Sequence, residues 1–117
     1  MYGNRPGKAY DPATAADELG VVLVSSYSNA GTLKRASLKD SYQFVLDDLA
    51  QSATCLKPDE NENDESYYDT LYFTIYAVNA LYARVYLNMQ EWDKAIEYAS
   101  KVIDSRKFKL SSTTEMI

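Results

Sequence analysis

Two amphipathic segments separated by only two residues constrain the fold of this chain most strongly. From about Tyr67 to Met89, apolar residues recur at spacings of three and four, the pattern of one side of a helix. A second such segment starts near Trp92 or Asp93. The first stripe consists of Leu71, Ile75, Val78, Tyr82, Val85, Tyr86 and Met89, and the second of Trp92, Ala95, Ile96, Ala99, Val102 and Ile103. Because only Gln90 and Glu91 join them, we expect two antiparallel helices that pack through these stripes.

A further helix is predicted before this hairpin. Ser37 and Asp40 form an S-x-x-D capping pattern, in which the hydroxyl accepts a hydrogen bond from a free backbone amide. The apolar stripe that follows consists of Leu38, Tyr42, Val45, Leu46, Leu49, Ala53 and Leu56. Pro58 ends the helix and opens a polar acidic loop over residues 58–66, whose Ser66 is placed to cap the next helix.

The predicted organisation has three parts. Residues 1–36, with two prolines and all four glycines, form an extended irregular arm that packs on helices. Residues 37–110 form the helical region, and residues 111–117 read as the tail of a truncated domain. The fold class is therefore all-α, because the strand-like run at residues 20–24 is too short to build a sheet.

Composition excludes several functions. The 117-residue chain has a formal net charge of -5, and its twelve Lys and Arg form no dense run, so nucleic acid is not an expected partner. There is no His, which removes the commonest general base and the commonest zinc ligand. Cys55 is the single cysteine and, without a His partner, is interpreted as a small packing residue. No stretch approaches the roughly 20 apolar residues that a membrane span requires.

No catalytic, cofactor or metal site is predicted. Asp47 and Asp48 point about 100° apart on a helix, so they cannot flank one bond as a hydrolase pair does. The loop that begins at Asp59 resembles a calcium loop, but Asp64 replaces its required Gly and Thr70 its bidentate Glu. Ligand-binding residues are not assigned.

Two aromatic features have alternative interpretations. Trp92 is interpreted as a packing residue of the hairpin rather than as a platform for stacking sugars. Tyr68, Tyr72 and Tyr76 share one helix side and are interpreted as a contact with another part of a longer protein.

The hairpin resembles a tetratricopeptide unit. In that repeat, small residues let two helices approach closely, a role expected of Ala83 and Ala95. Aromatic residues fill the space between the helices, a role expected of Tyr86 and Trp92. Gln90 departs from the pattern, because Gly is usual at the turn. A single unit cannot bury both of its faces, so it needs flanking structure.

The wider pattern resembles the SusD/RagB family. Four stretches, in the family's order, carry the resemblance: YDPATAADELGV at residues 10–21, RASLKDSY at 35–42, NALYARVYL at 79–87 and EWDKAIEYA at 91–99. Val22 stands where that family usually has Pro.

The resemblance implies a non-enzymatic role. SusD-like proteins are surface lipoproteins of the outer membrane that hold oligosaccharides over a TonB-dependent, SusC-like transporter. In that family the tetratricopeptide-like helices form a scaffold and a transporter-facing surface, whereas the glycan is bound mostly by loops outside the stretch matched here. A stand-alone peptide-binding tetratricopeptide adaptor is the alternative, and a hydrolase or metalloenzyme fragment is disfavoured by the absent His.

Overall fold

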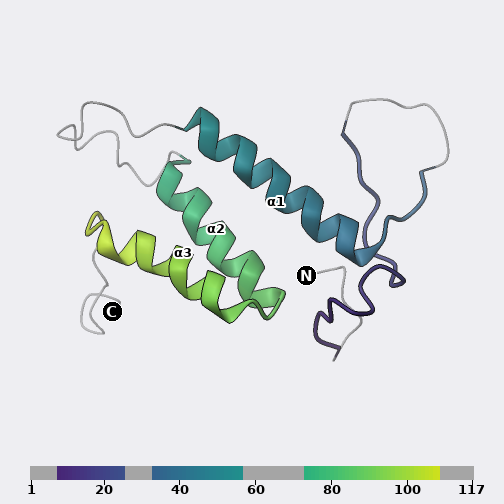
Figure 1. Ribbon diagram of the computed structural model, residues 1–117. Coiled ribbons are helices and arrows are strands. Elements are labelled where there is room, and N and C mark those ends of the chain that lie inside the picture. Colours follow the sequence, from purple (N-terminus) through teal and green to yellow (C-terminus); the bar gives the residue numbers. More distant parts are fainter. Residues whose placement is uncertain (1–7, 26–32, 57–72, 109–117) are drawn as a thin grey trace, which may run out of the picture.

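A computed structural model describes residues 8–25, 33–56 and 73–108, and within them the fold is all-α, as predicted. Three helices follow one another: α1 (Leu38–Cys55), α2 (Ile75–Asn88) and α3 (Trp92–Asp104). Figure 1 shows α2 between the other two helices, with α3 running back along it. No strand forms among the described residues, although Leu19 and Ser37 make an isolated antiparallel bridge. Several predictions concern residues outside the described ones: Pro58, the loop 58–66, Ser66, Tyr68, Leu71, Tyr72 and the tail 111–117.

Helix α1 begins where the capping pattern predicts. Ser37 has an extended backbone, and its Oγ accepts a hydrogen bond from the Asp40 amide at 3.0 Å. This bond satisfies one of the amide groups that the first turn leaves without a helical partner. The apolar stripe of α1 faces inward, with Leu38, Tyr42 and Leu49 buried.

Helix α2 is shorter than predicted at its amino end. The helix starts at Ile75, and the described residues before it, Phe73 and Thr74, are not helical. Thr74 is extended, with φ -112° and ψ 172°, and its carbonyl accepts the first helical bond from the Val78 amide at 3.1 Å. This is the backbone conformation of an N-cap residue, which precedes the first helical turn.

The turn between α2 and α3 is a Schellman motif. Gln90 takes the left-handed conformation, with φ 61°. Its amide donates to the Leu87 carbonyl at 3.1 Å, and the Glu91 amide donates to the Tyr86 carbonyl at 2.9 Å. This geometry explains why the tetratricopeptide pattern has Gly here, because Gly adopts a positive φ without steric cost.

The arm packs against the amino end of α1. Tyr10 and Ala15 are buried, and the Tyr10 ring meets the Tyr42 ring edge to face, with centroids 4.9 Å apart. Arg35 fastens the arm further along, because its Nε and Nη2 donate to the carbonyls of Gly20 and Leu19 at 2.7 and 3.1 Å. The arm thus closes one end of the helical layer (Figure 1).

Candidate functional site

Helix α3 presents its apolar residues in two directions, which corrects the prediction of one shared stripe. Ala95 faces α2 and is 8% exposed, but Trp92, Ile96 and Ile103 are 56%, 65% and 70% exposed. The interpretation of Trp92 as a packing residue of the hairpin is therefore wrong for the described structure. The helix is rotated so that a different side chain, Tyr98, faces the core.

A stack of three tyrosines takes the place expected of Trp92. The Tyr98 ring lies 4.5 Å from that of Tyr82 and 5.6 Å from that of Tyr86, centroid to centroid, with the planes nearly parallel. Tyr82 also donates a hydrogen bond to the Leu46 carbonyl of α1 at 3.3 Å, which links all three helices. The rotation of α3 brings the Tyr98 ring into stacking contact with two rings of α2.

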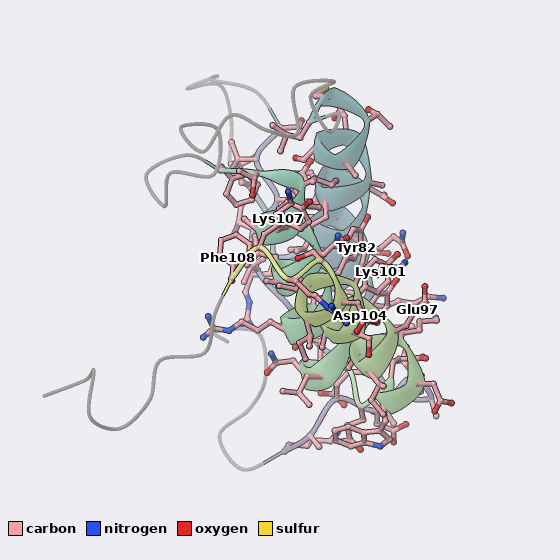
Figure 2. All side chains as sticks on the ribbon, turned by 90° about the vertical axis from the view of Figure 1, so that its left-hand side faces the viewer. Tyr82, Glu97, Lys101, Asp104, Lys107 and Phe108 are labelled. Carbon is pink, nitrogen blue, oxygen red and sulfur yellow. The ribbon has the colours of Figure 1, made fainter. Side chains whose placement is uncertain are left out.

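Two lysines cover the outer edge of the stack. Lys94 lies 5.2 Å from the centre of the Tyr86 ring, and Lys101 lies 4.1 Å from that of Tyr98. Lys101 also forms the predicted ion pair with Glu97, at 2.7 Å. Figure 2 shows Lys101 and Glu97 together on the outer side of α3, near Asp104. Cation–π contacts and exposed ion pairs together make this side polar.

The stack shifts the ionisation of its members. Burial, followed by the neighbouring Tyr98, raises the pKa of the Tyr82 hydroxyl, and the same two causes raise the pKa of Tyr86. The hydrogen bond to Glu97 raises the pKa of Lys101. All three groups therefore keep their neutral-pH forms, which fits a structural role for the stack.

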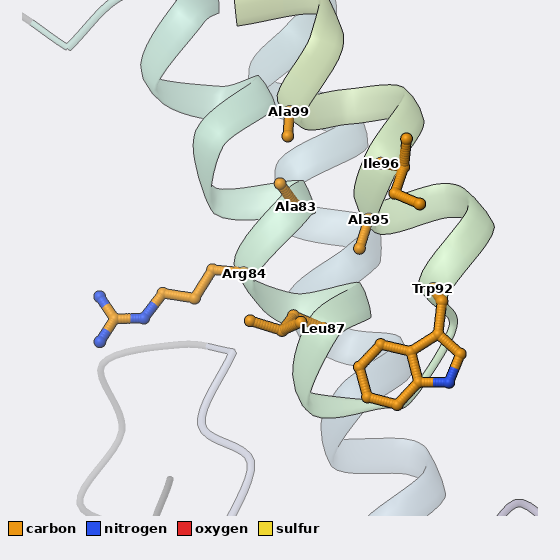
Figure 3. Close-up of a pocket in the computed structure, with 7 residues that line it drawn as sticks. All are labelled: Ala83, Arg84, Leu87, Trp92, Ala95, Ile96 and Ala99. Atoms are coloured by element: carbon orange, nitrogen blue, oxygen red, sulfur yellow. The ribbon is translucent and has the colours of Figure 1, made fainter. Parts of the chain in front are cut away.

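The exposed apolar residues of α3 form one wall of a groove. The groove has a volume of about 380 Å³ and runs between α2 and α3. Its lining residues are Ala83, Arg84, Leu87, Trp92, Ala95, Ile96 and Ala99. In Figure 3 the three alanines form the floor between the helices, while the Trp92 ring and Leu87 stand at one end. Small residues on the floor leave room for another helix to approach closely.

The groove has a single charged residue in its lining. The Arg84 guanidinium extends from α2 away from α3 (Figure 3), and no ion pair to it forms among the described residues. The remaining lining is apolar. Such a surface suits contact with another protein element rather than acid–base chemistry.

The residues considered for chemistry lie apart from the groove. Asp47 and Asp48 are exposed on α1, as expected of a solvated helix face. Cys55, the last residue of α1, is also exposed, so its interpretation as a packing residue is wrong. Within residues 8–25, 33–56 and 73–108, no cluster of three metal-ligating side chains forms. None of the helices described here has the length and apolar character to span a bilayer.

Comparison with known proteins shows a likeness to a solved structure. A solved structure of a SusD superfamily protein from Bacteroides thetaiotaomicron VPI-5482 matches with a TM-score of 0.67 and 27% sequence identity. The match covers 98% of this chain. The fold is SusD-like. No protein-family model matches the sequence, and neither does any curated protein.

The SusD-like match extends over only part of the neighbour. This chain spans 22% of the length of that solved structure. Most of the neighbour thus lies outside the matched region.

Sequence reasoning missed both the tyrosine stack and the groove. The signal for the stack was present, because Lys94, Tyr98 and Lys101 lie on one helix side with Ala95. The signal for the groove was the 4-3-4 spacing of Trp92, Ile96, Ala99 and Ile103, which is the seam spacing of packed helices.

Proposed function

We propose that this chain is the helical scaffold segment of a SusD-like surface lipoprotein of the outer membrane, which takes up oligosaccharides together with a SusC-like, TonB-dependent transporter. The observation that carries the proposal is the match to a SusD superfamily structure over almost the whole chain. The four sequence stretches that resemble the family support it independently. They extend from the arm, through α1, to the α2–α3 hairpin.

The contacts among the described residues support a scaffold role. The tyrosine stack ties the three helices together, and the arm is fixed to α1 by Tyr10 and Arg35. Apart from Arg84, the lining of the groove is apolar. Carbohydrate sites combine aromatic faces with several hydrogen-bonding groups, so oligosaccharide binding is assigned to other parts of the parent protein and the role of this segment is non-enzymatic.

The experiment is an affinity purification of the tagged parent protein from envelopes of its source cells. A large outer-membrane transporter should co-purify, and the purified parent should bind oligosaccharides in calorimetry. A control purification from cells that lack the transporter gene should yield the parent alone. Recovery of the parent from the cytoplasm, bound to peptide or chaperone partners, would contradict the proposal and support the tetratricopeptide adaptor.

A further inference from the structure

No further inference is drawn: the strongest candidate, the exposed apolar patch that Leu19, Val21, Val22 and Val24 form on the extended part of the arm, carries none because nothing in the structure shows what covers it.

Discussion

Gly20 is the residue at which the arm comes closest to α1. A Cβ at this position would meet the Ser41 hydroxyl, and it would lie 2.7 Å from the Ser37 carbonyl oxygen and 3.0 Å from the Leu38 Cα. Two of these three neighbours belong to backbone that the helix cap holds in place. The close approach also lets the Gly20 amide donate to the Ala36 carbonyl at 2.7 Å.

Gly20→Ala should therefore lower the free energy of unfolding by about 1–3 kcal/mol, the usual cost of an extra methyl in a packed site. Urea denaturation followed by circular dichroism measures the change. Ala16→Gly, at an exposed position in the same arm, is the control and should change stability far less. A stability for Gly20→Ala equal to that of the wild type would mean that the arm does not lie against α1.

The tyrosine stack makes stability depend on alkaline pH. The pKa of Tyr82 is raised above 10.0 in the folded chain by burial and by Tyr98, so the unfolded chain loses this proton first as pH rises. The folded state then binds more protons than the unfolded state, and the free energy of unfolding falls above about pH 10. Below that pH the contribution is fully present.

Tyr82→Phe should make this alkaline decline shallower. At pH 7 the variant should lose about 0.5–1.5 kcal/mol, because its ring no longer donates to the Leu46 carbonyl. Urea denaturation at pH 7, 9, 10 and 11 gives both quantities. The same decline in wild type and variant would show that Tyr82 does not titrate differently in the two states.

At the scale of elements, the α2–α3 turn holds a residue other than Gly in the left-handed conformation, which is unfavourable for a residue with a Cβ. Gln90 holds a φ of 61°, a conformation that costs a residue with a Cβ roughly 1–2 kcal/mol. Gln90→Gly should raise the free energy of unfolding by about 0.5–1 kcal/mol, measured by thermal and urea denaturation. Gln51→Gly, within α1, should lower it by a similar amount, because Gly is unfavourable in a helix interior. Destabilisation by both changes would contradict the left-handed turn.

The rotation of α3 predicts unequal roles for its two aromatic residues. Tyr98→Ala should lower the free energy of unfolding by about 2–3 kcal/mol, because Tyr98 stacks on both Tyr82 and Tyr86. Trp92→Ala should cost below about 1 kcal/mol in the 117-residue chain, because the indole is more than half exposed. The reverse order would restore Trp92 as the packing residue of the hairpin.

The sequence predicted elements better than it predicted their orientation. The start of α1 followed from the local bond between Ser37 and Asp40, and the hairpin followed from the two-residue turn at Gln90-Glu91. Local chemistry decides both of these features. The rotation of α3 depends instead on Tyr98 meeting rings from another helix, and a stripe of apolar residues does not tell which part of it will be covered.

The groove was not predicted, because a groove forms only where no neighbouring part of the chain covers the apolar face, and the sequence pattern does not show which face is covered. Periodicity marks Trp92 and Ile96 as apolar-face residues, whether the face meets α2 or another helix. The start of α2 was also placed too early, because the apolar pattern continues across Phe73 and Thr74, whereas Thr74 is the N-cap of the helix.

At the scale of the whole molecule, the partial match bears on the proposed function. Under the proposed function these helices are one layer of a longer SusD-like protein, and the match covers 22% of the solved SusD superfamily structure. The predicted division into an arm at 1–36, a helical region at 37–110 and a tail at 111–117 belongs to this proposal. Under the adaptor alternative, the groove between α2 and α3 would be the ligand site of a small independent protein.

The most direct test is the intact mass and lipid modification of the native gene product in fractionated cell envelopes. The account predicts a polypeptide several times longer than 117 residues, acylated at its amino-terminal cysteine and present in the outer-membrane fraction. A small unacylated protein in the cytoplasmic fraction would contradict it.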